Sequence, residues 1–193
     1  INDTSSVGTI TNSGTITASA GEDDDTAYGI YVDDNSSVGT ITNSGTITAS
    51  AGDDDAIGLH VSATSTINTI TNTGIIRGIA DDSVGRGIRV WGKSIINTLD
   101  NQVGGTISGS AVGRLAYGIV VSNQSTIASL TNSGLITAIS DTKDFVFGIR
   151  VRNKGVIDSL TNTGTISAFA GDTTGRTESA IGIQIISFTG LSS

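Results

Sequence analysis

The chain has 193 residues, a formal net charge of −8 and no cysteine, methionine or proline. Without cysteine it can form no disulfide, redox motif or cysteine-ligated zinc site, and its acidity argues against nucleic acid, which requires a basic surface. No run of about 18 apolar residues is present, so we expect no helix that spans a membrane. Aromatic residues are few (one Trp, three Tyr and four Phe), so a core must be aliphatic, and the β-branched residues favour strands.

Charge is distributed unevenly along the chain. All ten Lys and Arg lie from Arg77 onward, whereas ten of the eighteen Asp and Glu precede it. Residues 1–76 therefore carry ten acidic and no basic side chains, and residues 77–193 carry eight acidic and ten basic ones. We expect the two ends of the chain to present different surfaces.

The sequence repeats about every 30 residues. An Asn that follows Thr or Asp returns at spacings of 31, 29, 29, 31 and 30 residues, at Asn12, Asn43, Asn72, Asn101, Asn132 and Asn162. A Gly followed by Ile or Leu returns with a similar period, at Gly29, Gly58, Gly87, Gly118, Gly148 and Gly182. Repeats of this length are typical of stacked architectures, and six of them fill the chain.

Within the first repeat, apolar and polar residues alternate, which is the period of a strand and not of a helix. Strands are expected at residues 9–12, 15–18 and 29–32. Ile10, Ile16 and Ile30 face inward from them, and Ile or Leu occupies the equivalent positions of every later repeat. A further aliphatic column starts at Val7, three residues before Ile10, and this break in the alternation predicts a bend at which both side chains face inward.

These columns predict an all-β fold, a parallel β-helix (β-solenoid) in which each repeat forms one coil and gives one strand to each of three sheets. Six coils at about 4.8 Å each make a rod about 30 Å long. Residues 1–193 then form one β-solenoid domain. Because the sequence starts and stops within the repeat, we expect it to be a segment of a longer repeat protein.

Polar columns accompany the aliphatic ones. The repeated Asn faces inward, where its amide can bond to the Asn above and below, so we predict a buried Asn ladder. A Gly two residues later is interpreted as a turn that needs positive φ: Gly14, Gly45, Gly74, Gly134 and Gly164. Serine recurs before the first strand, at Ser5, Ser36, Ser65, Ser94 and Ser125, with Gly155 in the last repeat. In the fourth repeat, the turn at residues 101–105 is two residues longer than in the other repeats, and this insertion predicts a bulge.

Several segments of the sequence resemble the repeats of a known protein family. STIASLTNSGLITA (residues 125–138), KGVIDSLTNTGTISA (residues 154–168) and the recurring Gly-Ile-x-Val are similar to repeats in the passenger domains of Gram-negative autotransporters, the type V secreted proteins. The resemblance covers essentially the whole chain. It implies a β-helix that is exported through the outer membrane and displayed on the cell surface or released. Such passengers include adhesins, enzymes and passive stalks, so the resemblance leaves the function open.

Acidic residues cluster between the second and third strands of the first three repeats, at Glu22, Asp23, Asp24, Asp25, Asp53, Asp54, Asp55, Asp81 and Asp82. Stacked carboxylates suit Ca²⁺, so these aspartates are a candidate calcium site. Neither the EF-hand spacing nor the Gly-Gly-x-Gly-x-Asp nonapeptide is present. The acids disappear in the fourth repeat, and a solvated loop without a cofactor is the alternative that we favour.

Threonines form an outward array on the first strands, in the pairs Thr9/Thr11, Thr40/Thr42 and Thr69/Thr71. Such an array resembles the flat faces of β-solenoid ice-binding proteins. The pattern stops at Asp100, and Thr is also an ordinary residue of an exposed strand. Ice binding is therefore a lesser alternative.

The single histidine belongs to an outward column of the third strands that varies freely and that we interpret as solvent-facing: Tyr31, His60, Arg89, Val120, Arg150 and Gln184. A serine triad needs an acid beside the histidine, and no Gly-x-Ser-x-Gly elbow is present. Some carbohydrate-active enzymes share the β-helix fold, which keeps that class as an alternative by analogy. We expect no catalytic residue and no enzyme activity.

The sequence therefore predicts a non-enzymatic stalk or adhesin segment, extracellular or on the outer-membrane surface of a Gram-negative-type bacterium. Its partner would be a host or neighbouring cell surface. The predicted binding surface combines the outward column with nearby aromatic groups, at Tyr28, Tyr31, His60, Arg89, Tyr117, Phe145, Phe147 and Arg150. The alternative is an extracellular filament, in which copies stack head to tail through open sheet edges.

Overall fold

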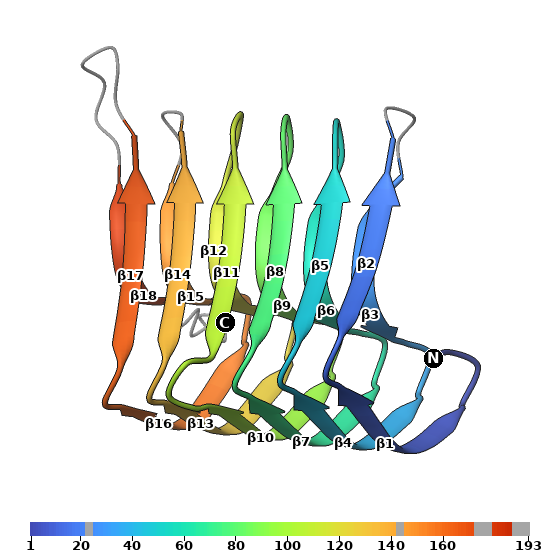
Figure 1. The fold of residues 1–193 in the computed structure, drawn as a ribbon. Coiled ribbons are helices and arrows are strands. Elements are labelled where there is room, and N and C mark those ends of the chain that lie inside the picture. The colour runs from blue at the N-terminus through green and yellow to red at the C-terminus, as the bar shows by residue number, and fades with distance from the viewer. Residues whose placement is uncertain (22–24, 142–144, 172–178, 187–193) are drawn as a thin grey trace, which may run out of the picture.

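The computed structural model describes residues 1–21, 25–141, 145–171 and 179–186. Its strands form three parallel six-stranded sheets, and each turn of the chain adds one strand to each sheet (Figure 1). The fold is the predicted parallel β-helix of six coils. No helix in the described part of the chain is long and apolar enough to cross a membrane.

We name the sheets A, B and C after the first, second and third strands of each coil. Sheet A contains β1 (Ser6–Asn12), β4 (Ser37–Asn43), β7 (Thr66–Asn72), β10 (Ile95–Asn101), β13 (Thr126–Asn132) and β16 (Val156–Asn162). Sheet B contains β2 (Thr15–Ala20), β5 (Thr46–Ala51), β8 (Ile75–Ala80), β11 (Thr106–Ala111), β14 (Leu135–Ser140) and β17 (Thr165–Ala170). Sheet C contains β3 (Ala27–Val32), β6 (Ala56–Val61), β9 (Gly85–Val90), β12 (Ala116–Val121), β15 (Val146–Val151) and β18 (Ala180–Ile185). Equivalent residues pair in register from coil to coil, as Ile10 does with Ile41.

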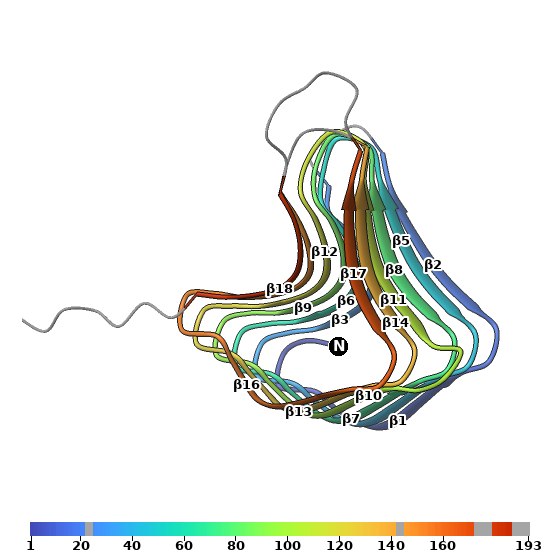
Figure 2. The ribbon, with the colours of Figure 1, turned by 90° about the vertical axis from the view of Figure 1, so that its left-hand side faces the viewer.

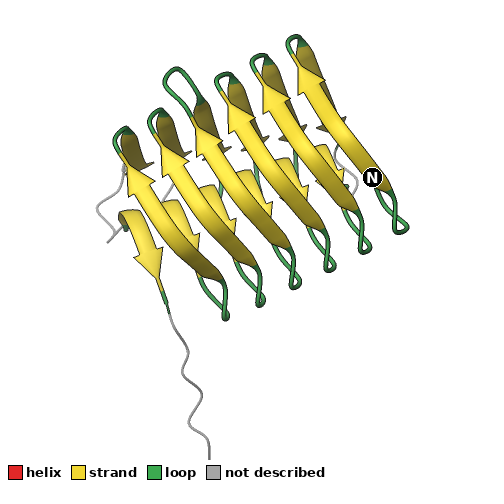
Figure 3. Cartoon of the chain, turned by 90° about the horizontal axis from the view of Figure 1, so that it is seen from below, coloured by secondary structure: helices red, strands yellow, loops and turns green. Residues whose placement is uncertain are grey.

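Seen along the stack, the coil is wide at one end and narrow at the other (Figure 2). All three sheets enclose the wide part, whereas sheets B and C alone face each other in the narrow part. The strands of sheet C bend where the two parts meet (Figure 2). Figure 3 shows the coils from below as parallel rows of strands.

Two kinds of core fill these two spaces. The wide part holds a continuous stack of Ile, Leu and Val side chains from all three sheets, and the predicted columns of Ile10, Ile16 and Ile30 belong to it. Small side chains fill the narrow part in two clusters, where the backbones leave little room. These clusters contain Ala27, Ala49, Ala51, Ala56 and Ala80, and then Ala111, Ala116, Ala138 and Val146.

The predicted bend in the first strands is confirmed. Val38 and Ile41 are both buried in the aliphatic stack although they are three residues apart. The pairing of β4 with β1 passes from Val38 to Thr40 and omits Gly39. The strand therefore turns at this glycine and directs both aliphatic side chains inward.

The buried Asn ladder is also confirmed. Each Nδ2 donates to the Oδ1 of the Asn in the next coil, at 2.7 to 2.8 Å, from Asn12 through to Asn162. Because every donation points the same way, the ladder satisfies the buried amides and fixes the register of the stack. It continues through the predicted bulge in the fourth coil, where Gly104 has a φ of 87° and Val103 is 80% exposed.

The interpretation of the glycines that follow the Asn is wrong. Gly45 and its equivalents do not have positive φ. A Cβ on Gly45 would overlap the main-chain oxygen of Gly14 in the preceding coil, so close contact between stacked backbones requires the glycine. Apart from Gly104, the described residues with positive φ lie at the corner between sheets C and A, in pairs of turn residues such as Asp34 and Asn35.

The serine column forms a second ladder. Ser36 Oγ accepts a hydrogen bond from the main-chain N of Ser5 at 3.1 Å, and Ser65 Oγ accepts one from the main-chain N of Ser36 at 3.1 Å. The same contact repeats at Ser94 and Ser125. These hydroxyls tie the start of sheet A in each of the first four coils to the next coil.

Candidate binding face

The bend in sheet C comes from the repeated glycine of the Gly-Ile-x-Val pattern. A Cβ on Gly87 would lie 2.7 Å from Ile107 Cγ2 and 2.9 Å from the main-chain N of Ser108. The missing side chain therefore lets sheet C approach sheet B closely. The pairing of β9 with β12 omits this glycine, passing from Arg86 to Ile88. The strand turns there, so outward residues three positions apart lie on the same concave side.

Two outward columns therefore face each other across the bend. One contains Tyr28, Ile57, Arg86, Tyr117, Phe147 and Ile181. The other contains Tyr31, His60, Arg89, Val120, Arg150 and Gln184. We name the surface formed by these two columns the sheet C face. It also includes the outward residues that follow the second column, namely Asp33, Ser62, Trp91, Ser122 and Arg152.

The interpretation of the Tyr31 column as solvent-facing is wrong for His60 and Val120. His60 and Val120 are 4% and 2% exposed, and Tyr117 and Phe147 across the bend are each 1% exposed. The two columns cover each other inside the bend, which buries side chains that a flat strand would leave in water. The remaining predicted surface residues are partly or fully exposed: Tyr28, Tyr31, Arg89, Phe145 and Arg150.

In coils 1 and 2 the sheet C face carries a cluster of rings. The Tyr28 and Tyr31 rings stack with centroids 4.4 Å apart, and the His60 ring stacks against both, at 5.3 and 5.1 Å. Tyr31 OH donates to Asp33 Oδ2 at 2.6 Å, and Ser62 Oγ donates to Asp33 Oδ1 at 2.5 Å. Burial and the bond to Asp33 raise the pKa of Tyr31. Burial acts to raise the pKa of Asp33, but the two hydrogen bonds outweigh it and lower that pKa below its ordinary value.

His60 is neutral in this cluster. Burial of the ring, together with the positive charges of Arg89 and Arg86, lowers the pKa of His60 to about 3. Neither ring nitrogen has a hydrogen-bond partner among the described residues. The arrangement therefore differs from a Ser-His-Asp triad, in which a carboxylate orients the imidazole.

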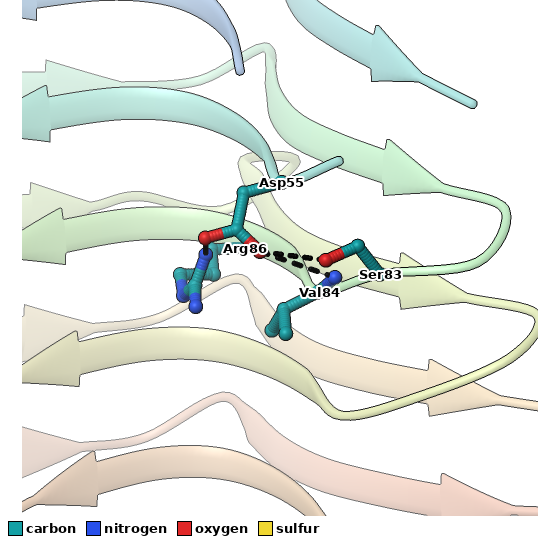
Figure 4. Close-up of polar contacts among 4 residues, drawn as sticks. All are labelled: Asp55, Ser83, Val84 and Arg86. Atoms are coloured by element: carbon teal, nitrogen blue, oxygen red, sulfur yellow. Dashed lines mark hydrogen bonds and ion pairs between the residues drawn. The ribbon is translucent and has the colours of Figure 1, made fainter. Parts of the chain in front are cut away.

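Asp55 ties the second acidic loop to the next coil (Figure 4). Its Oδ2 lies 2.6 Å from Arg86 Nη1, and its Oδ1 accepts hydrogen bonds from Ser83 Oγ at 3.1 Å and from the main-chain N of Val84 at 3.3 Å. Arg86 is only 8% exposed, so this ion pair compensates a buried charge. Both oxygens of Asp55 are engaged, which sets it apart from the other described aspartates of the acidic loops.

The calcium hypothesis rests on the remaining acidic residues. Asp23 and Asp24 lie outside the described residues. Their described counterparts are exposed or partly exposed on the loops: Asp25, Asp53, Asp54, Asp81 and Asp82. Over residues 1–21, 25–141, 145–171 and 179–186, no three His, Cys, Asp or Glu side chains are grouped so that they could hold a metal ion.

In the later coils, arginines and aromatic rings share the sheet C face. Arg150 lies over the Phe147 ring at 4.3 Å, and its Nη1 donates to Tyr117 OH at 3.1 Å. Arg89 lies over the Trp91 ring at 5.5 Å. Cation–π contacts of this kind position the guanidinium groups without neutralising their charge.

A hollow of about 490 Å³ lies at the corner between sheets C and A. The turns of three successive coils line it, with Gly92, Lys93, Asn123, Gln124, Asn153 and Lys154. All six residues have φ between 50° and 70°. Each turn directly follows an outward residue of the sheet C face, namely Trp91, Ser122 or Arg152, so the hollow adjoins that face.

The threonine array keeps the register that the sequence predicted. Thr40 pairs with Thr69 and Thr42 with Thr71, and the next coil places Asp100 beside Thr71. The regular T-x-T array therefore ends after three coils.

Arg86, Trp91 and Arg152 are basic or aromatic residues of the sheet C face that were not selected from the sequence as part of the binding surface. The strand period of two leads from Arg89 to Trp91 and from Arg150 to Arg152, so two of them carry a sequence signal. Arg86 lies three positions before Arg89, and only the bend places it on the same side.

Comparisons with models of known protein families, with characterised proteins and with solved structures give no match to this chain.

Proposed function

We propose that the chain is a rigid segment of a bacterial surface or secreted adhesin, which acts by binding and not by catalysis. The rod holds the sheet C face outward and presents it to a host or neighbouring cell surface. The resemblance to autotransporter passenger repeats supports an extracellular or outer-membrane location.

The observation that carries this proposal is the contrast between a constant interior and a varied concave face. The interior keeps Ile, Leu or Val in its columns and Asn in its ladder through all six coils. The sheet C face changes from Tyr31 to His60 to Arg89 in successive coils. Solenoid proteins use such surfaces, built on a regular stack, to bind extended partners.

A second candidate is a filament unit formed by head-to-tail stacking. Val7 and Ile10 of β1 occupy the same columns as Ile157 and Leu160 of β16, and all four are partly buried. A copy stacked in register would cover these side chains and extend the Asn ladder from Asn162. Light scattering after size exclusion separates the candidates, because a concentration-independent monomer mass would argue against the filament, and rods of several lengths would support it.

Adhesion of coated beads tests the adhesin proposal. Beads that carry the chain should be retained on a cell layer under flow more strongly than albumin-coated beads. The variant Arg89→Ala, Phe145→Ala should reduce retention, whereas Thr42→Ala on the outer side of sheet A should not. Retention equal to that of albumin-coated beads would contradict the proposal.

A further inference from the structure

The sheet C face and the adjoining turns are strongly basic over coils 3 to 5. Six cationic side chains lie there: Arg86, Arg89, Lys93, Arg150, Arg152 and Lys154. Within the described part of the chain, Asp55 is the one carboxylate that forms an ion pair with any of them, and it holds Arg86. Because the chain as a whole carries −8, these coils form a positive region on an acidic rod.

Three of these cations are partly buried and have no counter-ion among the described residues. Burial, together with the charge of Arg86, lowers the pKa of Arg89. The Nε atoms of Arg150 and Arg152 are buried and have no hydrogen-bond partner among the described residues. Holding like charges together at a partly dry surface is unfavourable, and an anionic ligand would offset that cost.

The hollow at the corner offers a place for such a ligand. Lys93 and Lys154 come from turns two coils apart, which corresponds to about 9.6 Å along the rod, and the turns of Asn123, Gln124 and Asn153 complete the lining. In the described structure, the side chains of these five residues make no hydrogen bonds. The lysine ammonium groups of this hollow can bind acid groups of a ligand. Its Asn and Gln side-chain amides can form hydrogen bonds with hydroxyl groups of the same ligand.

Trp91 adds a flat apolar surface beside the hollow. It is the single tryptophan of the chain and is 38% exposed, with Arg89 over its ring. An exposed indole can pack against the C–H face of a sugar ring, and a guanidinium fork can bind a carboxylate or sulfate through two hydrogen bonds.

We propose that this basic corner, formed by Trp91, Lys93, Asn123, Arg152 and Lys154, binds an acidic polysaccharide. The sugar chain runs along the rod, and its carboxylate or sulfate groups meet the cations of coils 3 and 5. The inference rests on the adhesin proposal, since it names the ligand of the adhesive face. A polysaccharide fits better than single-stranded nucleic acid, which stacks successive bases on several aromatic rings, because the corner offers one ring and several amides.

The fluorescence of Trp91 reports directly on the site. The chain is titrated with an oligouronate, a sulfated oligosaccharide, a neutral oligosaccharide of the same length and a single-stranded oligonucleotide. We expect a saturable change with at least one acidic oligosaccharide that weakens as salt is added, and none with the neutral one. Whichever of the oligouronate and the sulfated oligosaccharide binds more tightly shows whether the site prefers carboxylate or sulfate groups.

Single substitutions locate the site. Lys93→Ala and Lys154→Ala should each raise the Kd about fivefold, since each removes one close charge. Both residues are exposed, and circular dichroism checks that the variants are folded. The matched control is Arg114→Ala, which removes an exposed cation from another loop and should leave the Kd within about twofold.

Four results would overturn the inference: no saturable change with either acidic ligand, equal binding of the neutral one, tighter binding of the oligonucleotide, or an equal effect of Arg114→Ala. The bead experiment keeps the two proposals separable. Adhesion without binding of acidic oligosaccharide would overturn this inference alone, and binding by a chain whose beads do not adhere would overturn the adhesin proposal alone.

Discussion

Asn72 Nδ2 donates a hydrogen bond to Asn101 Oδ1 across 2.8 Å in the interior of the rod, and both side chains are fully buried. On the outer side of the same sheet, Asn97 Nδ2 donates to Asn68 Oδ1 across 3.0 Å in an exposed pair. The two pairs join the same two coils by the same chemistry. They differ in burial, which makes them a matched test of what the interior ladder contributes.

Replacing Asn72 by Ala should lower the free energy of unfolding by about 2–4 kcal/mol, because Asn101 Oδ1 loses its donor and Asn43 Nδ2 loses its side-chain acceptor. Replacing Asn68 by Ala should change it by no more than about 0.5 kcal/mol. Urea denaturation followed by circular dichroism measures both. Equal losses would show that burial adds nothing to the ladder.

Gly45 and Gly14 test the role of the glycines that follow the Asn. Gly45→Ala places a Cβ against the backbone of Gly14, so we expect a loss of at least about 2 kcal/mol. A Cβ on Gly14 meets nothing within 4 Å, and Gly14→Ala should be neutral or stabilising by up to about 1 kcal/mol. Denaturant midpoints compare the two variants. If a local turn conformation required the glycine, both variants would lose similar stability.

His60 should make the fold less stable in acid. Its folded-state pKa of about 3 lies below the ordinary value of 6.5, so the unfolded chain binds more protons between these values. Stability contributed by the neutral ring is present above about pH 6.5 and falls by about 1.4 kcal/mol per pH unit toward pH 3.

The variant His60→Phe keeps a ring against Tyr28 and Tyr31 but cannot be protonated. We expect its free energy of unfolding, relative to the wild type, to rise steadily as the pH is lowered from 7 to 4. Carboxylates distant from His60 titrate alike in both proteins and cancel in this difference, whereas Asp33 interacts with the imidazole. A difference that is constant with pH would contradict the neutral, buried histidine.

Asp55→Asn should lower the free energy of unfolding by about 2–4 kcal/mol, because it leaves the buried Arg86 guanidinium without its counter-ion. The double variant Asp55→Asn, Arg86→Met should recover most of the loss, since no unpaired charge then remains. Thermal and urea melts of the two variants make the comparison. A double variant no more stable than the single one would mean that the ion pair does not compensate a buried charge.

The fold could largely be predicted from the sequence because the interior presents the same demand in every coil. Ile10 and Asn12 recur in each repeat, so repetition itself identifies the positions that face inward. The role of Gly45 could not be predicted, since a glycine serves equally well for positive φ and for close contact between backbones. Only the spacing of the stacked coils distinguishes the two.

The candidate site was harder to predict, because its columns vary from coil to coil and repetition carries no information there. Alternation directs the Tyr31 column outward, but it does not show that the bend buries His60. Tyr28 and Tyr31 have the same three-residue spacing that identified the bend at Val7 and Ile10. Whether such a pair faces inward or outward depends on the approach of sheet C to sheet B, which involves residues distant in the sequence.

The central claim is that the sheet C face, with its basic corner, is the binding surface of the rod. The most direct test is to map, by ¹H–¹⁵N NMR, the amide signals that shift when an acidic oligosaccharide is added. We expect shifts concentrated at Trp91, Lys93, Asn123 and Lys154, with none at Thr42 on the outer side of sheet A. Shifts centred on sheet A, or no shifts at saturating ligand, would contradict this claim.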